Sequence, residues 1–209
     1  MMIFQLPPLG PMSKRAICSN CERPQTTCIC DALITMECNY QLIILQDPTE
    51  SRHALSSAPI LEKSIRNTRL LIGEIFDPEK IIGPDWQSCS VLIFPSEHAV
   101  TANPLRDSQI STVILLDGTW KKARRLMHLN PWLRELPTFA LQPDQLSKYK
   151  IRKSPRTDGL STIEAAVCVL NELQPEKDFS GILAAFHKMI ELQITAMGED
   201  TFKKNYPPS

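Results

Sequence analysis

The sequence predicts an α/β fold in which a mainly parallel sheet is covered by helices on both faces. Three short apolar runs have the length and composition of buried strands, and segments with helical signals lie between and after them. Chains in which strands and helices alternate build parallel sheets with helices packed on both sides. With 209 residues, 43% of them hydrophobic, the chain can fill one core of ordinary size.

The predicted strands are apolar runs of four or five residues, rich in branched side chains. They are QLIIL at 41–45, VLIF at 91–94 and TVILL at 112–116, with TFAL at 138–141 as a weaker fourth. Runs that are apolar at consecutive positions, rather than at alternate ones, indicate strands buried on both faces. We therefore expect the inner strands to contact helices on both sides.

Four segments carry helical signals: about 59–71, 119–128, 161–173 and 179–197. The first begins with Pro59, which suits a first helical turn. The third begins with a capping box formed by Ser161 and Glu164. The fourth has a continuous apolar stripe, which predicts a helix that faces the core, with Asp178 as its cap.

The first 35 residues are rich in proline and cysteine and show no amphipathic period. The stretch CSNCERPQTTCIC has four cysteines with the spacing C-x2-C-x6-C-x-C: Cys18, Cys21, Cys28 and Cys30. Four thiolates at this density predict one tetrahedral Zn(II), which would replace the core that so small a lobe lacks. An iron–sulfur cluster, which also accepts four thiolates, is the competing interpretation.

Composition also bears on location and partners. No apolar run approaches the roughly 20 residues that span a bilayer, and the opening MMIFQLPPLG lacks the features of a signal peptide. We therefore expect a cytoplasmic protein with reduced thiols and no membrane partner. The 23 basic and 23 acidic residues balance, which argues against a protein that coats nucleic acid non-specifically.

This balance conceals a strongly basic stretch. Residues 121–156 contain ten Lys and Arg but only two acids, a net charge of +8 that the rest of the chain offsets. Such a segment predicts a basic face that attracts a polyanion to one side of the protein. An ordinary solvated surface is the alternative that composition leaves open.

Three stretches place polar residues or glycine where a strand ends or a helix begins: LIFPSEHA at 92–99, LLDGTW at 115–120 and DGLSTIEA at 158–165. In open parallel sheets, ligands bind beyond the carboxyl ends of the strands. Asp117, which ends a strand directly before Gly118, therefore lies where a ligand could bind. A carboxylate that satisfies turn amides or caps the next helix is the competing interpretation.

These motifs, taken together, occur in the order and spacing of the DTW-domain family, which the sequence resembles from Cys18 to about Leu173. They are the cysteine set, NTRL at 67–70, the Phe-Pro strand end at 94–95, Asp-Gly-Thr-Trp at 117–120 and LSTIEA at 160–165. The resemblance implies a SPOUT-like α/β fold with a C-terminal trefoil knot that holds the cofactor. It divides the chain into a four-cysteine zinc-binding lobe (1–35) and a catalytic domain (36–209).

The resemblance further implies a tRNA-uridine aminocarboxypropyltransferase. Such an enzyme moves the 3-amino-3-carboxypropyl group of S-adenosylmethionine to N3 of a tRNA uridine, and it releases methylthioadenosine. An RNA methyltransferase on the same fold and a non-catalytic zinc-containing RNA-binding protein are the alternatives. A methyltransferase would release S-adenosylhomocysteine instead, and an RNA-binding protein would show no saturable S-adenosylmethionine binding.

The implied reaction assigns roles to the residues of these motifs. Asp117 is the candidate base that removes the N3 proton. The S-adenosylmethionine pocket is expected at Pro95, Ser96, Gly118, Thr119, Trp120, Leu160, Ser161 and Thr162. The tRNA phosphates are expected to contact Lys121, Arg124, Arg125, Arg152 and Arg156. Asp47 receives no catalytic role, because we expect many family members to carry a His-Pro-like pair at this point of the chain.

Overall fold

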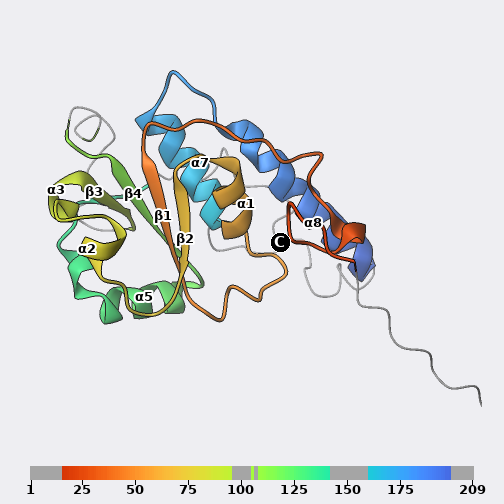
Figure 1. Cartoon of the computed structure of the whole chain (residues 1–209), viewed down its shortest axis with the longest axis horizontal. Coiled ribbons are helices and arrows are strands. Elements are labelled where there is room, and N and C mark those ends of the chain that lie inside the picture. The colour runs from red at the N-terminus through yellow and green to blue at the C-terminus, as the bar shows by residue number, and fades with distance from the viewer. Residues whose placement is uncertain (1–15, 96–104, 106–107, 142–159, 199–209) are drawn as a thin grey trace, which may run out of the picture.

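The computed structural model describes residues 16–95, 105, 108–141 and 160–198. Its centre is a five-stranded sheet in the order β2-β1-β4-β3-β5, in which every pair of neighbours is parallel (Figure 1). The strands are β1 (Gln41–Gln46), β2 (Thr68–Ile72), β3 (Ser90–Ile93), β4 (Thr112–Asp117) and β5 (Thr138–Phe139). The predicted α/β class with a parallel sheet is therefore confirmed, as are the four predicted strands.

Helices connect and cover these strands. The α-helices are α1 (Ala58–Ser64), α2 (Pro78–Ile81), α3 (Trp86–Cys89), α5 (Trp120–Leu129), α7 (Thr162–Leu173) and α8 (Leu183–Met197). Three short 3-10 helices are η1 (Gln25–Thr27), η2 (Pro131–Arg134) and η3 (Ser180–Ile182). The capping box predicted at the start of α7 is present, because Ser161 and Glu164 bond each other's backbone amides.

The helix predicted over 59–71 is wrong in its second half. Helix α1 ends at Ser64, and the chain then turns through Asn67, whose φ is +63°, before it enters strand β2. Asparagine adopts this left-handed conformation more readily than most residues do. The strand was missed because its neighbours at the sheet edge bury it only in part, so its sequence shows no apolar run of its own.

The start of the last helix was also predicted too early. Asp178 accepts a hydrogen bond at 2.9 Å from the backbone amide of Ser180, the first residue of η3. Helix α8 begins at Leu183, and Ile182 is its N-cap residue. The predicted cap therefore acts on a short 3-10 turn that precedes the helix.

Side chains of the inner strands alternate between two hydrophobic clusters, one on each face of the sheet. On strand β1, Leu42 and Ile44 belong to the cluster that contains residues of α1, α7 and α8. Ile43 and Leu45 belong to the other cluster, which contains residues of α2, α3, α5 and η2. Both faces are thus covered, as the apolar runs of the sequence predict.

The connections that leave β1 and β4 run to opposite faces of the sheet. After β1 the chain passes through α1 on one face to reach β2, and after β4 it passes through α5 and η2 on the other face to reach β5. Because β1 and β4 are neighbours, the sheet has a topological switch point between their carboxyl ends. This is where open parallel sheets bind their ligands.

The cysteine-containing segment packs beside α8 rather than standing apart (Figure 1). Cys21 and Ile29 are buried in the same cluster as residues of α8, such as Met189. Ion pairs join the segment to two helices: Asp31 pairs with Lys188 of α8, and Glu22 pairs with Lys63 of α1 at 3.0 Å. The boundary at residue 35 between two parts stays a prediction.

The trefoil knot and the SPOUT-like arrangement also stay predictions. Residues 96–104 after β3 and 142–159 before α7 lie outside the described residues, and so do the predicted site residues Ser96, Arg152 and Arg156. In the part of the chain that is described, no helix has the length and hydrophobicity to cross a membrane.

Candidate functional site

The switch point brings two polar side chains together at the ends of β1 and β4. The register pairs Gln46 with Asp117, the last residues of the two strands. Gln46 is fully buried and Asp117 is 7% exposed. An amide and a carboxylate thus stand side by side at the edge of the sheet where a ligand is expected.

The carboxylate of Asp117 is held by donors from two other elements. Gln46 Nε2 donates to Oδ2 at 2.7 Å, and the hydroxyl of Thr162, at the start of α7, donates to Oδ1. Each carboxylate oxygen can accept about two hydrogen bonds, so both retain acceptor capacity. The carboxylate is therefore fixed in orientation and can still accept further hydrogen bonds.

The structure assigns the capping of α5 to Thr119 and not to Asp117. The Thr119 hydroxyl accepts a hydrogen bond from the backbone amide of Lys122 at 3.4 Å. The side-chain bonds of Asp117 to described residues run to β1 and α7 instead. The competing interpretation, in which Asp117 caps the next helix, is thus not what the structure shows.

Gly118 allows the chain to leave β4 directly beside α5. Its φ is +154°, and a Cβ atom there would lie 3.0 Å from Cβ of Lys122. Residues other than glycine rarely adopt this conformation. The glycine therefore lets the strand end and the first turn of α5 approach closely.

Two aromatic side chains lie near the ends of β3 and β4. The rings of Phe94 and Trp120 meet edge to face, with centroids 6.0 Å apart. Trp120 nevertheless remains 48% exposed, so that it packs and also offers ring surface to a ligand. Pro95, which follows Phe94, is exposed at the same strand end.

The start of α7 lies at the end of β4, where Thr162 contacts Asp117. Glu164 is buried and accepts hydrogen bonds from the backbone amide and the hydroxyl of Ser161, at 2.8 and 2.6 Å. These bonds account for Glu164 without a ligand. Leu160, Ser161 and Thr162 are all partly buried, and Thr162 alone bonds Asp117.

The loop between β1 and α1, residues 47–57, carries two buried carboxylates that the sequence analysis did not assign to the site. Lys122 Nζ lies 2.9 Å from Oε1 of Glu50, and Arg125 lies 3.4 Å from Oδ2 of Asp47. Both acids lie within five residues of the end of the strand predicted at 41–45, which is the signal that could have placed them near Asp117. Their ion pairs with α5 could not be predicted from the sequence, because these contacts depend on the order of the strands in the sheet.

The charge state of Asp47 follows from its surroundings. Burial alone would raise the pKa of this carboxyl group. Hydrogen bonds from the hydroxyl and amide of Thr49, with the positive charges of Lys122 and Arg125, outweigh burial, so the pKa lies below its ordinary value. Asp47 is therefore ionised at neutral pH and forms an ion pair with Arg125.

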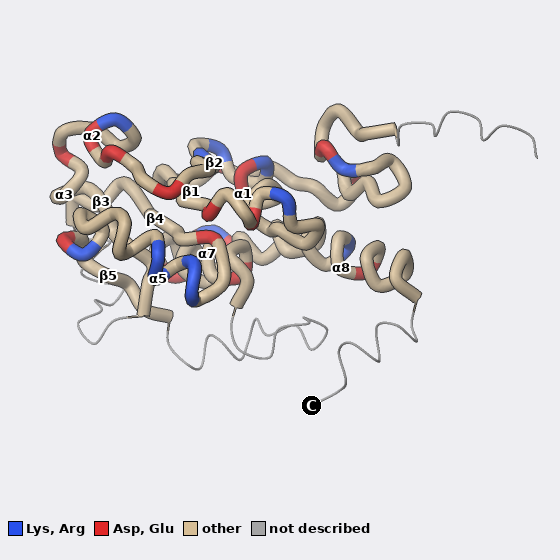
Figure 2. Tube along the Cα trace, turned by 90° about the horizontal axis from the view of Figure 1, so that it is seen from below, with Lys and Arg blue, Asp and Glu red and all other residues tan. Residues whose placement is uncertain are grey.

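Figure 2 shows Lys and Arg gathered along α5. The ion pairs of their side chains divide these basic residues into two groups. Lys122 and Arg125 point to the β1–α1 loop, and Arg125 also pairs with Glu74 at 2.8 Å. Lys121 and Arg124 are exposed, and no described carboxylate lies within ion-pairing distance of either. Only the second group is free to bind an external polyanion, so Arg125 is a weaker candidate for phosphate contact than the sequence suggests.

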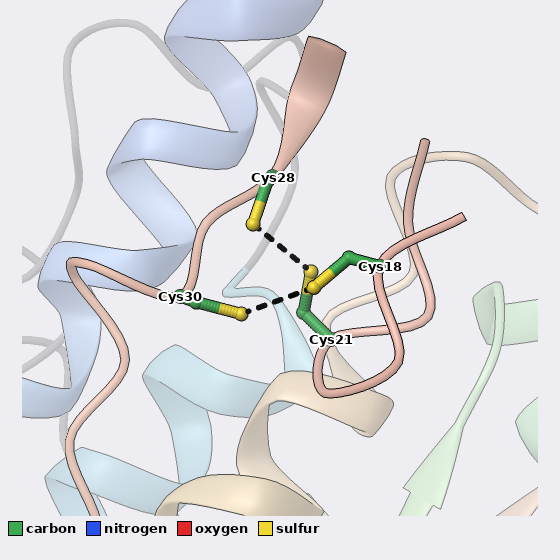
Figure 3. Close-up of side chains that lie close together, drawn as sticks. All are labelled: Cys18, Cys21, Cys28 and Cys30. Atoms are coloured by element: carbon green, nitrogen blue, oxygen red, sulfur yellow. Dashed lines mark hydrogen bonds between the residues drawn. The ribbon is translucent and has the colours of Figure 1, made fainter. Parts of the chain in front are cut away.

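The four predicted metal ligands converge on one point (Figure 3). The sulfur atoms of Cys18 and Cys30 are 3.5 Å apart, those of Cys21 and Cys28 are 3.7 Å apart, and all four lie within 4.8 Å of one another. A tetrahedral zinc ion with bonds of about 2.3 Å brings its sulfurs to about 3.8 Å. The spacing suits a single ion better than a cluster that spreads its thiolates over several iron atoms.

The backbone favours thiolate at this cluster. Amide groups of Cys21 and Asn20, assisted by the Cys30 thiol, lower the pKa of Cys18 to about 6. The hydrogen bond with Cys18 raises the pKa of Cys30 to about 12. Thiolate is the form that binds metals.

Comparison with known proteins adds a family to this geometry. The model of the DTW domain matches residues 15–194. The chain belongs to the DTW domain family. The matched range includes both the cysteine cluster and the strand ends around Asp117. No solved structure gives a significant match.

Several curated relatives share one activity in their names. The chain is 30% identical to tRNA-uridine aminocarboxypropyltransferase 2 of Macaca fascicularis, over 80% of this chain and 59% of the relative. It is 28% identical to the protein of the same name from Drosophila melanogaster, over 88% and 77%. For tRNA-uridine aminocarboxypropyltransferase A of Arabidopsis thaliana the identity is 29%, over 78% and 74%. The chain thus spans about three fifths of the macaque and mouse relatives, 59% in each case.

The close approach at Gly118 leads to a test. We expect Gly118→Ala to lower the free energy of unfolding by about 1–3 kcal/mol, because the new side chain adds backbone strain and crowds Lys122. Urea unfolding measures the loss. Gly83→Ala is the matched control, since Gly83 has a φ of +129° but no atom within 4 Å of the added Cβ. Equal losses in the two variants would show that crowding against α5 is unimportant.

Proposed function

We propose that the chain is a tRNA-uridine aminocarboxypropyltransferase that uses S-adenosylmethionine and forms acp3U in tRNA. The observation that carries the proposal is its membership of the DTW domain family, together with the shared name of its relatives. The polar side chains at the switch point support it, because such a position suits a ligand site.

The proposed reaction moves a three-carbon chain and not a methyl group. Uridine N3 forms a bond to Cγ of the 3-amino-3-carboxypropyl chain, the bond from Cγ to the sulfonium sulfur breaks, and methylthioadenosine leaves. The N3 proton passes to a base. Three carbons on the sulfonium are electrophilic, so the site must select one of them by orientation, and alignment supplies much of the rate.

Asp117 is the proposed base. Two hydrogen bonds, from Gln46 and Thr162, fix its carboxylate, and both oxygens keep acceptor capacity for the N3 proton. The carboxylate is nearly buried, which limits competition from water. Gln46 and Thr162 would act as positioning residues, since their bonds go to Asp117.

The S-adenosylmethionine pocket is proposed along the same sheet edge. Backbone groups at Gly118 and at the start of α7 would bind the co-substrate, and the exposed ring surface of Trp120 would stack on a base or on adenine. The proposed lining otherwise consists of Pro95, Ser96, Thr119, Leu160, Ser161 and Thr162. A SPOUT-like arrangement with a trefoil knot belongs to this proposal.

The cysteine cluster is proposed to hold one structural Zn(II). The support is the donor set of four thiols within 4.8 Å, which suits a tetrahedral ion. Such a metal would stabilise the lobe through its binding free energy and would take no part in the transfer.

One experiment tests the proposed activity directly. The purified protein is incubated with unmodified tRNA and S-adenosylmethionine labelled in its carboxypropyl chain, and nucleosides are then analysed by mass spectrometry. We expect labelled acp3U together with methylthioadenosine. Formation of S-adenosylhomocysteine and a methylated nucleoside would identify a methyltransferase. Binding of tRNA without saturable S-adenosylmethionine binding would identify a non-catalytic RNA-binding protein.

The proposed base can be tested with Asp117→Asn, which keeps the size of the side chain but removes its basicity. We expect the variant to bind S-adenosylmethionine and tRNA and to lose roughly 100-fold or more in single-turnover rate. Higher pH should restore part of the rate, because hydroxide can deprotonate the uridine instead. A folded, fully bound variant with a rate close to that of the unchanged protein would exclude this role.

The metal proposal predicts one zinc ion per chain in the purified protein. Cys28→Ser should remove a ligand and loosen the lobe before the main sheet, which hydrogen exchange of residues 16–35 against 112–117 can measure. Cys89→Ser is the control, because Cys89 lies outside the cluster. Iron and sulfide in the folded protein, or no metal at all, would contradict the proposal.

The division of α5 into two groups predicts how tRNA binds. Reversal of both exposed residues, in Lys121→Glu with Arg124→Glu, should weaken tRNA binding and lower the slope of log affinity against log salt by about 2. The affinity for S-adenosylmethionine should not change. Arg66→Glu with Lys80→Glu makes the same change of charge on other elements and serves as the control. If both double variants bind tRNA equally well, α5 is an ordinary solvated surface.

A further inference from the structure

The side chain of Arg23 joins the cysteine-containing lobe to the β1–α1 loop. Its guanidinium donates a hydrogen bond to the backbone carbonyl of Ala54 at 2.8 Å and contacts the sulfur of Met189 in α8. Arg23 lies two positions after Cys21, one of the four clustered thiols. The contact thus joins the segment of the cysteine cluster to the middle of the loop that follows β1.

Arg23 is a partly buried cation without a carboxylate partner among the described residues. None of the described acids lies within ion-pairing distance of its guanidinium. Four thiolates around Zn(II) carry a net charge of −2, so a loaded cluster would balance this cation.

The same loop reaches the candidate base a few residues farther on. The hydroxyl of Ser56, two positions after Ala54, accepts a hydrogen bond at 3.1 Å from Gln46 Nε2, which also donates to Asp117. The hydroxyl of Ser57 accepts the backbone amide of Ile163 at 3.4 Å, one residue after Thr162. Both donors to Asp117 are therefore connected to the segment that Arg23 holds.

The other end of the loop is already fixed by α5. Lys122 and Arg125 pair with Glu50 and Asp47, close to β1. Between these ion pairs and α1, Arg23 supplies a side-chain hydrogen bond from another element to the loop backbone. Without it, the positions of Ser56 and Ser57 would depend on their hydrogen bonds to Gln46 and Ile163 and on the loop itself.

We propose that Arg23 is a positioning residue, through which the cysteine lobe holds the β1–α1 loop and thereby orients Gln46, Thr162 and the carboxylate of Asp117. The expected effect of Arg23 on catalysis rests on the proposed function. The expected effect of Arg23 on the position of the loop does not depend on that function. It gives the lobe a part in the geometry of the site, in addition to its own folding. The link is a chain of hydrogen bonds between named groups, and it needs no change of fold.

Hydrogen exchange of the loop tests the proposal without any assay of activity. In Arg23→Met, with one zinc per chain retained, we expect amides of 47–57 to exchange about ten-fold faster, the change that follows from one lost hydrogen bond to a charged group. The control is Lys63→Met, which breaks the neighbouring ion pair to Glu22 but does not touch the loop. Unchanged exchange in folded Arg23→Met would overturn the proposal.

Kinetics supply the second readout. Arg23→Met should lower the single-turnover rate at saturating substrates with little change in the KM for tRNA, and Arg23→Lys, which keeps a charged donor, should recover part of the rate. A change confined to KM would count against positioning of Asp117. If the unchanged protein transfers nothing, the proposed function fails, and loop exchange still decides the role of Arg23.

A third measurement covers the case in which Arg23→Met does not fold. Exchange of the unchanged protein is followed in urea below its unfolding midpoint. We expect residues 16–35 and 47–57 to lose protection in one step, before 162–173. Loss of protection in the loop while the lobe stays protected would refute the link.

Discussion

The parallel pairing of β1 with β4 is the constraint on which the candidate site depends. It places Gln46 beside Asp117 at the point where the chain leaves for opposite faces of the sheet. A carboxylate buried at this edge needs donors in place of water, and Gln46 and Thr162 supply them from β1 and α7. The site therefore needs two features together: the switch point between β1 and β4, and a polar residue at the end of each of these strands.

Helical periodicity explains why one basic run serves two purposes. Residues three apart on a helix lie on the same side, so Lys122 and Arg125 share one side of α5, and Lys121 and Arg124 share the next. The first pair neutralises Asp47 and Glu50, which would be costly to bury without partners. The second pair remains exposed. The net charge of this stretch of sequence therefore overstates the number of basic side chains that are available to RNA.

Features that depend on residues close together in the chain could be predicted from the sequence. Features that depend on contacts between distant parts of the chain could not. The capping box at Ser161 and the apolar runs of the inner strands were predicted, because each depends on residues close in the chain. Strand β2 was missed, since an edge strand needs no continuous apolar run. Asp117 was found from its place after a strand, but its donor Gln46 required the order of strands in the sheet. The convergence of the cysteines followed from their spacing alone.

The cysteine-containing lobe is set apart from the rest of the chain by its composition but not by its packing. Composition changes near residue 35, yet Ile29 is 1% exposed and shares a cluster with Met189 and other residues of α8. Removal of the lobe would expose that part of the core to water, at a cost that grows with the apolar area uncovered. A metal bound by the cysteines would therefore contribute to the stability of the whole molecule, because the lobe cannot unfold without uncovering the helices that support the sheet.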